Sequence, residues 1–509
     1  MNIKQAKQEI ANTLKAYLTR DALGNYLIPS IRQRPVLLMG PPGIGKTQIM
    51  EQIAAEEGVG LVAYTITHHT RQSAIGLPFI EKRTYGGEEF SVTEYTMSEI
   101  LASVYRLMER TGLKEGILFL DEINCVSETL APMMLQFLQC KTFGNQRLPE
   151  GWLIVAAGNP PEYNKSVRDF DVVTLDRVKR IDVSEDFAVW KEYAYRKGIH
   201  GAVISYLDIK KDNFYRVETT VDGLQFATAR GWEDLSELIF AYEKLGLRVD
   251  REVVGQYIQL PRVAKDFSNY LELYYKYQRT YHVDDILRGQ WQNITMLELR
   301  EAPFDEKLSV MGLMLSRLAE AARETRRQDA LATVLHAALT EFKAKIADAD
   351  PQAVLAQLVW QRQTRLKQAK EAGQLAKETR DLGQREINAL EDYRQRLQRE
   401  DIAAPDAMNA VREWFGSEVE RRGALGTETR ARFDNAFRFL EQTFGQDQEL
   451  VIFVTEVTAG YDTSWFVENF GCDAYFRHNR ELLFDDTRHR IREEIAAAKA
   501  AEREGESHV

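Results

Sequence analysis

Short apolar runs alternate with amphipathic stretches over the first 185 residues. Most of these runs are rich in Val, Ile and Leu and lack alternating polar positions, which is typical of a strand buried on both faces of a parallel sheet. The runs cover residues 36–39, 61–66, 117–120, 152–157 and 181–183. The stretches between them predict helices over residues 48–57, 98–110 and 128–139. This alternation predicts an α/β domain with a parallel sheet.

A different pattern precedes the first strand, with apolar side chains at steps of three and four. Ile3, Ala6, Ile10, Leu14 and Leu18 would form one stripe along a helix over residues 3–18. We expect this amphipathic helix, within residues 1–20, to pack on the α/β domain.

Helical patterns dominate after residue 184. Apolar stripes in the last part of the chain are formed by Leu308, Met311, Leu315 and Leu318 and, less regularly, by Leu382, Ile387, Leu390, Tyr393 and Leu397. A chain of 509 residues exceeds what one hydrophobic core usually serves. We predict an α/β domain at 1–185, a helical region at 186–290, and a helical C-terminal region at 291–509 that binds a partner or client.

Two features of the C-terminal region leave alternatives open. Residues 361–400 are rich in charged side chains and Gln, which predicts a long exposed helix or a helical hairpin broken near Gly373 or Gly383. No heptad holds for three repeats, so packed helices are favoured over a coiled arm. An aromatic cluster consists of Tyr461, Trp465, Phe466, Phe470, Tyr475 and Phe476. It forms either part of the core or a partner-docking surface.

The stretch between the first strand and its helix carries the phosphate-binding pattern G-x-x-x-x-G-K-[ST]. Its residues, with the one that follows, are Gly40, Pro41, Pro42, Gly43, Ile44, Gly45, Lys46, Thr47 and Gln48. The glycines let successive N–H groups face phosphate oxygens at the positive end of the helix dipole. Lys46 would reach the β- and γ-phosphates of ATP, and the Thr47 hydroxyl would hold Mg²⁺.

Polar residues follow two of the predicted strands. Asp121 and Glu122 end the strand at 117–120, at the edge of a parallel sheet where α/β folds bind ligands. We expect Asp121 to position magnesium and Glu122 to accept a proton from, or orient, the attacking water. Asn159 follows the strand at 152–157 and would hydrogen-bond that water or the γ-phosphate, although an Asn-Pro pair is also a plain turn former.

Farther on, Thr228 would cap a helix from which Arg230 reaches back to the γ-phosphate, unless Arg230 is simply solvated.

Composition and net charge indicate which partners the protein binds and in which cellular compartment it functions. The net charge of −11 argues against a broad nucleic-acid-binding face. The N-terminus lacks the apolar core of a signal peptide, and the apolar runs are too short to span a bilayer. Three cysteines without C-x-x-C spacing indicate free thiols. These features predict a cytoplasmic protein that does not cross a membrane.

Taken in chain order, these motifs resemble those of AAA+ ATPases, and specifically the MoxR-like group. The resemblance covers roughly residues 20–290. Gly40–Thr47 corresponds to Walker A, residues 117–122 to Walker B, Asn159 to sensor 1, and residues 228–233 to sensor 2. Arg177 occupies the place of the arginine finger. Val178 stands where the family usually has an aromatic residue, so Arg180 is a second candidate for the finger.

The resemblance implies a doubly wound α/β domain followed by a helical lid, in a ring that is commonly hexameric. ATP would lie between neighbouring subunits, and Arg177 would act on the phosphoryl group of the next subunit. Family members are chaperone-like remodelling ATPases that often work with a partner carrying a von Willebrand factor A domain. Two β-hairpin insertions are also implied, with residues 76–90 and 144–152 as candidates. An apolar tip at 77–79 would touch a substrate at a central pore, or it belongs to an ordinary hairpin.

Three functions are compatible with these motifs. The preferred hypothesis is an ATP-hydrolysing enzyme that remodels a protein client. The first alternative is the same motor acting on nucleic acid, which the acidic net charge disfavours. The second is a nucleotide-gated scaffold with little turnover, which would need neither Glu122 nor Asn159.

Overall fold

The structure is a computed structural model that describes residues 1–68, 76–143, 146–163, 167, 170–220, 223–346, 349–372 and 377–480. The chain divides into two units. Unit 1 comprises Met1–Val189, Thr228–Arg230 and Ala338–Ala404, and unit 2 comprises Trp190–Ala227, Gly231–Ala337 and Pro405–Val509. The three-part division expected from the sequence stays a prediction, and the end of its last part, residues 481–509, lies outside the described residues.

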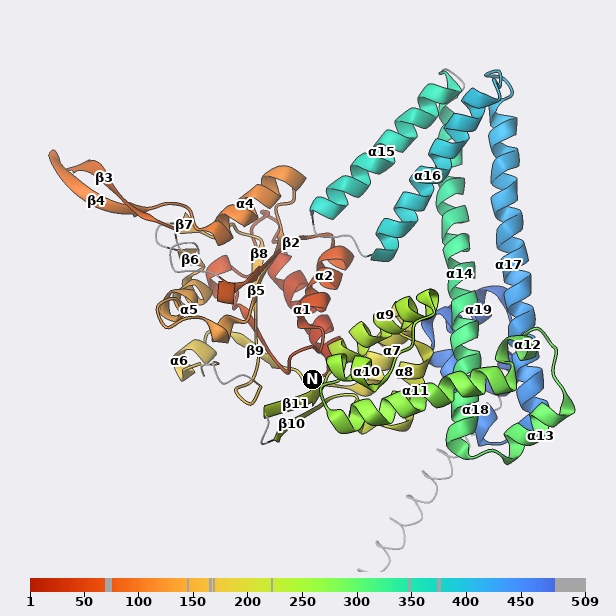
Figure 1. The fold of residues 1–509 in the computed structure, drawn as a ribbon. Helices are drawn as coiled ribbons and strands as arrows, with labels where there is room; N and C mark the ends of the chain where they lie inside the picture. Colours follow the sequence, from red (N-terminus) through yellow and green to blue (C-terminus); the bar gives the residue numbers. More distant parts are fainter. Residues whose placement is uncertain are drawn as a thin grey trace, which may run out of the picture. The chain divides into compact units, whose positions relative to one another are not determined.

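A parallel sheet forms the centre of unit 1 (Figure 1). Among the described residues it has five strands in the order β2-β5-β8-β1-β9. They are β1 (Val36–Met39), β2 (Gly60–Thr65), β5 (Gly116–Asp121), β8 (Trp152–Gly158) and β9 (Lys179–Asp182). Leu38 of β1 pairs with Ala157 on one side and Ile181 on the other. All five strands coincide with the predicted apolar runs to within about two residues, which confirms the parallel sheet.

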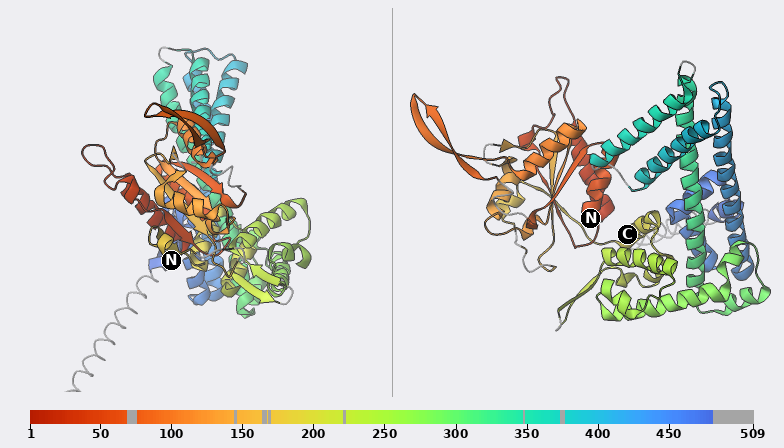
Figure 2. Two further views of the ribbon diagram at one scale, coloured as in Figure 1. Left: turned by 90° about the vertical axis from the view of Figure 1, so that its left-hand side faces the viewer. Right: turned by 45° about the horizontal axis from the view of Figure 1, so that its top comes forward.

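Helices cover both faces of this sheet (Figure 2). Helices α1 (Ile3–Leu18) and α2 (Lys46–Glu57) pack with Val36 and Leu38 in one apolar core. Helices α4 (Glu99–Thr111) and α5 (Ala131–Cys140) pack with Leu37 in the core of the opposite face. The predicted α/β fold class, a doubly wound sheet followed by a mostly helical region, is therefore confirmed.

Two of these helices show how local sequence sets their limits. The Asn2 side chain accepts a hydrogen bond from Gln5 N and the Gln5 side chain accepts one from Asn2 N, a capping box that starts α1 at the predicted residue. Helix α5 was expected from residue 128 but begins at Ala131. Pro132 lies in its first turn, where proline is tolerated because that N–H needs no helical partner.

Two antiparallel hairpins extend from unit 1. Strands β3 (Pro78–Tyr85) and β4 (Glu88–Tyr95) are joined by Gly86 and Gly87, which have φ of 62° and 94°. Two positive φ values are what a two-residue hairpin turn requires. Figure 1 shows this hairpin pointing away from the sheet. The second consists of β6 (Thr142–Phe143) and β7 (Gln146–Arg147). It begins two residues before the predicted segment at 144–152 and ends five residues before the end of that segment; residues 144–145 lie outside the described residues.

Helices make up most of unit 2. They are α7 (Phe187–Lys197), α8 (Gly201–Ile209), α9 (Ala229–Leu245), α10 (Arg251–Tyr257), α11 (Pro261–Tyr281), α12 (Val283–Leu287), α13 (Asn293–Glu301), α14 (Phe304–Lys345), α17 (Ala407–Phe444), α18 (Gln448–Ala459) and α19 (Tyr461–Phe470). Helices α7, α9 and α14 each include residues assigned to unit 1. One departure from the helical pattern is a hairpin of β10 (Arg216–Thr220) and β11 (Gly223–Ala227). The β-branched residues Val217, Thr219 and Thr220 favour a strand there.

The charged stretch at 361–400 belongs to a helical hairpin of α15 (Pro351–Glu371) and α16 (Lys377–Arg399). Gly383 does not break α16. A Cβ at this position would lie 2.9 Å from Leu366 Cδ1, so the glycine allows the two helices to approach closely. Gly373 lies outside the described residues. Arg362 bonds to Glu341 and Glu386, each at 2.8 Å.

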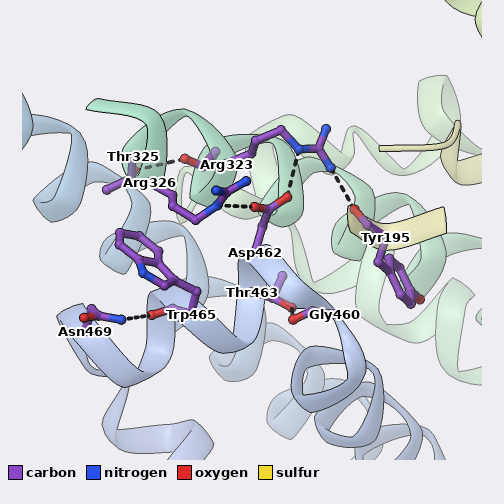
Figure 3. Close-up of polar contacts among 10 residues, drawn as sticks. Tyr195, Arg323, Thr325, Arg326, Gly460, Asp462, Thr463, Trp465 and Asn469 are labelled. Carbon is purple, nitrogen blue, oxygen red and sulfur yellow. Dashed lines mark hydrogen bonds and ion pairs between the residues drawn. The ribbon is translucent and has the colours of Figure 1, made fainter. Parts of the chain in front are cut away.

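The aromatic cluster near the end of unit 2 is partly core, since Phe466 and Tyr475 are buried whereas Tyr461 is exposed. Phe466 is fully buried and stacks on Phe433 and Phe470, with both pairs of ring centroids 5.1 Å apart. Beside it, Asp462 has a side chain that is only 1% exposed and accepts hydrogen bonds from Nε of Arg323 and of Arg326, each at 2.8 Å (Figure 3). Helix α19 is thus fixed to α14 by an ion-pair triad at its first turn.

Candidate active site

The loop between β1 and α2 depends on glycine at two positions. Gly43 and Gly45 have φ of 76° and 95°, in the left-handed region that glycine adopts without strain. Helix α2 then begins at Lys46, so its first N–H groups lie at the end of the loop. The loop therefore has the curled backbone and helix start that phosphate binding requires, at the carboxyl end of a central strand.

Lys46 lies at the centre of the site and is 8% exposed. Its ammonium donates hydrogen bonds of 2.8 Å to Gly40 O, Pro41 O and Asn159 Oδ1. Burial lowers the pKa of Lys46 to about 8; Asp121 counteracts this shift, whereas Arg230 adds to it. A desolvated cation with polar contacts is suited to receive the negative charge of phosphate oxygens.

Thr47 and Asp121 meet across the loop. Thr47 Oγ1 donates a hydrogen bond of 3.1 Å to Asp121 Oδ2, and Asp121 Oδ1 accepts one of 2.9 Å from Glu122 N. A hydroxyl beside a carboxylate is a hard-oxygen donor set of the kind that Mg²⁺ prefers. The residues present therefore fit magnesium. In the part of the chain that the structure describes, no cluster of three or more His, Cys, Asp or Glu could hold a metal alone, so phosphate and water oxygens would have to complete the coordination.

Glu122 has an unusual backbone. Its φ is 57°, which is uncommon for a residue with a Cβ and is tolerated where the surroundings impose it. The turn follows directly on β5 and is continued by the short helix η3 (Ile123–Cys125). Thr67, in η2 (Ile66–His68) after β2, donates a hydrogen bond of 2.9 Å from Oγ1 to Glu122 Oε2. Sequence reasoning missed Thr67, because only the folded sheet brings the ends of β2 and β5 together.

Asn159 joins the same site from the end of β8. Its side-chain oxygen accepts a hydrogen bond from Lys46, and its backbone oxygen accepts one of 2.8 Å from Asn124 Nδ2. Asn124 was also missed, although its position two residues after Glu122 could have suggested that it points toward the neighbouring strand end. Lys46, Thr47, Asp121, Glu122 and Asn159 therefore converge on the carboxyl edge of the sheet.

A comparison with known families agrees with this geometry. Residues 35–178 match the family model of the AAA domain (dynein-related subfamily). The match supports an ATPase of the AAA+ class. It begins one residue before β1 and ends one residue before β9, so it spans the site described above. No curated protein matches the chain.

The three arginines proposed from the sequence lie in different places around the α/β domain. Arg177 is exposed and donates a hydrogen bond to Gln139, and Arg180 is exposed and pairs with Asp182. Neither makes a described contact with Lys46. Arg230 does approach the loop, because a Cβ on Gly43 would lie 3.4 Å from Arg230 Cβ. The structure thus brings one of the three arginines to the phosphate loop within a single chain.

No helix in the described ranges combines sufficient length with sufficient apolar character to cross a bilayer.

Proposed function

We propose that this chain is a MoxR-like AAA+ ATPase that hydrolyses ATP with magnesium and remodels a protein client. The observation that carries the proposal is the convergence of Lys46, Thr47, Asp121, Glu122 and Asn159 on one strand edge of a domain of the AAA class. A nucleotide-binding scaffold without turnover would need neither the Glu122 carboxylate nor the Asn159 amide at this edge.

Each of these residues has a role in the proposed reaction. Lys46 binds the β- and γ-phosphates, because its positive charge is desolvated and attracts the phosphate oxygens. Thr47 and Asp121 would hold magnesium, which when bound would neutralise charge on the phosphates. Glu122 orients the attacking water and accepts its proton, and Asn159 hydrogen-bonds that water or the γ-phosphate. The loop from Gly40 to Gln48 surrounds the phosphates with its N–H groups.

We further propose that the active site is completed by a neighbouring subunit in a ring, with six subunits as the working hypothesis. Arg177 is exposed on the chain that carries it and makes no described contact with its own phosphate loop. An arginine donated in trans is a known way to stabilise charge on a transferring phosphoryl group. Arg180, which pairs with Asp182, is the second candidate, and Arg230 would act in cis.

The client and partner follow from the MoxR-like resemblance. We propose a protein client and a partner with a von Willebrand factor A domain. The net charge of −11 disfavours nucleic acid, and the three free cysteines are compatible with a reducing cytoplasm.

The first test is the ATP hydrolysis rate per subunit, measured as protein concentration is raised with magnesium present. A specific rate that climbs and then levels off supports a site shared between subunits. A flat, appreciable rate contradicts the ring, and no turnover at any concentration, with or without a client, contradicts the ATPase itself.

Two variants separate binding from chemistry. Glu122→Gln should keep nucleotide affinity and lose at least about 100-fold in kcat, because general bases contribute about 10²–10⁴-fold. Lys46→Ala should weaken nucleotide binding. Equal nucleotide affinity of Lys46→Ala and wild type would overturn the assignment of the phosphate loop.

A further inference from the structure

Asn124 links the two strand ends that carry the proposed catalytic groups. It lies in η3, two residues after Glu122, and is only 3% exposed. Its Nδ2 donates a hydrogen bond of 2.8 Å to the backbone oxygen of Asn159. A buried side chain from the β5 end therefore fixes the main chain at the β8 end.

The absence of a side chain at Gly158 leaves space for the Asn124 side chain. A Cβ on Gly158 would lie 2.6 Å from Asn124 Oδ1 and 2.9 Å from its Cγ, closer than such atoms normally approach. The Asn124 oxygen has no hydrogen-bond partner among the described residues. Because this oxygen makes no hydrogen bond there, the Nδ2 bond to Asn159 and the close approach to Gly158 are the contacts that place the side chain.

Asn159 connects Asn124 to Lys46 through two hydrogen bonds. Asn159 Oδ1 accepts a hydrogen bond of 2.8 Å from the Lys46 ammonium, so the placement of the Asn159 backbone decides where this oxygen lies. Pro160 follows and supplies no N–H to anchor the chain. The bond from Asn124 thus fixes the main chain at the residue whose side chain faces the phosphate loop.

We propose that Asn124 is a positioning residue for ATP hydrolysis, acting through Asn159, and that Gly158 is required to accommodate it. This inference rests on the proposed ATPase function and deepens it. Asn124 itself touches neither Lys46 nor Glu122 through any described hydrogen bond, so its effect must pass through the Asn159 backbone.

The decisive experiment measures kcat and nucleotide affinity for Asn124→Ala, Asn159→Ala and the double variant of the full chain. Asn124→Ala should lower kcat about 10-fold, since small displacements of a catalytic group can cost up to about 100-fold, while the affinity for ADP changes less than about twofold. If Asn124 acts through Asn159, the double variant should be no slower than Asn159→Ala alone.

Three further variants distinguish a loss of positioning from a general loss of folding. Asn124→Asp keeps the size of the side chain but removes the donor, so it should lower kcat as Asn124→Ala does. Gly158→Ala should displace Asn124 and reproduce the same loss of kcat. Asn435→Ala is the matched control, because Asn435 Nδ2 makes the same kind of bond, 3.0 Å to Leu287 O, within unit 2. It should leave kcat unchanged.

The outcomes separate this inference from the function on which it rests. A wild-type chain without turnover overturns the ATPase proposal. A wild-type chain with turnover, combined with additive effects of Asn124→Ala and Asn159→Ala, overturns the positioning role. Folded Asn124→Asp and Gly158→Ala variants with wild-type kcat would overturn it as well.

Discussion

The Thr67 hydroxyl donates a hydrogen bond to the Glu122 carboxylate, with 2.9 Å between Thr67 Oγ1 and Glu122 Oε2. The bond joins the end of β2 to the turn after β5, where Glu122 has a φ of 57°. This hydrogen bond occupies one of the two carboxylate oxygens of Glu122 with a protein donor. Thr67 therefore holds Glu122 in a conformation in which one carboxylate oxygen is bonded to the protein and is not free to bond the attacking water.

Removing this hydroxyl should raise basal turnover. Thr67→Val keeps the branched shape but loses the donor, and a net hydrogen-bond contribution of about 1 kcal/mol corresponds to a rise of about fivefold in kcat. The measurement is steady-state ATP hydrolysis at saturating magnesium and nucleotide. Thr67→Ser keeps the hydroxyl and should behave as wild type. A fall in kcat for Thr67→Val, with Thr67→Ser unchanged, would show that the bond assists Glu122.

The charge of Lys46 makes nucleotide affinity depend on pH. Burial lowers the pKa of Lys46 to about 8, so the ammonium loses its proton as the pH rises through this value. Phosphates bind the charged form, and binding must then take up a proton. The dissociation constant for ADP should therefore rise above pH 8, by up to about tenfold per pH unit.

Lys46→Arg is the matched control, because arginine keeps its charge throughout this range. Its ADP affinity should vary little between pH 7 and about 9.5, whatever its absolute value. Thermal stability is a less selective readout, because burial also lowers the pKa of Lys141 to about 8. For both lysines the unfolded state binds more protons above pH 8, so stability should rise with pH there. A wild-type ADP affinity that is flat across pH 8 would contradict the role given to Lys46.

The sequence was sufficient for the features that depend on local pattern. The sheet strands, α1 and the loop at Gly40–Thr47 follow from apolar runs, helical periodicity and a spaced motif, and each is found where expected. Thr67 and Asn124 could not be found in this way, because their partners lie 55 and 35 positions away in the sequence. Their contacts depend on which strands become neighbours in the sheet. The burial of Lys46, and hence its lowered pKa, has the same origin.

Two details of the helical regions were not evident from the sequence. Gly383 was one of two positions proposed for a break between helices, but it lies within α16, where its missing side chain makes room for Leu366 of the facing helix. The β10–β11 hairpin interrupts a region expected to be helical. Packing against the facing helix accounts for the glycine, whereas the β-branched residues of β10 give that segment a local preference for a strand.

A shared active site makes a prediction about mixtures. Arg177→Ala should lower kcat at least about 100-fold, in line with the large contributions of trans-acting arginines, while ADP binding stays as in wild type. Mixing it with Lys46→Ala should restore part of the turnover, because a ring then contains sites with an intact loop beside an intact arginine. The measurement is ATP hydrolysis against mixing ratio at fixed total protein.

Arg180→Ala is the comparison for this experiment, since Arg180 is exposed and pairs with Asp182 on its own chain. We expect a small effect. If Arg180→Ala is inactive and is rescued in mixtures while Arg177→Ala turns over normally, Arg180 is the trans-acting arginine. Absence of rescue in every mixture would contradict a site shared between subunits.

The triad around Asp462 should dominate the local stability of α19. Arg323 and Arg326 are 20% and 15% exposed, and both donate to the nearly fully buried Asp462 carboxylate. Asp462→Asn keeps the shape but removes the carboxylate charge that both guanidinium groups share, which should cost about 3–5 kcal/mol. Hydrogen–deuterium exchange of the Tyr461–Phe470 amides, together with denaturant unfolding, would report this loss. Asp392→Asn removes an exposed pair with Arg396 and should cost less than about 1 kcal/mol. Unchanged exchange in α19 of Asp462→Asn would show that apolar packing around Phe466 holds the helix without the triad.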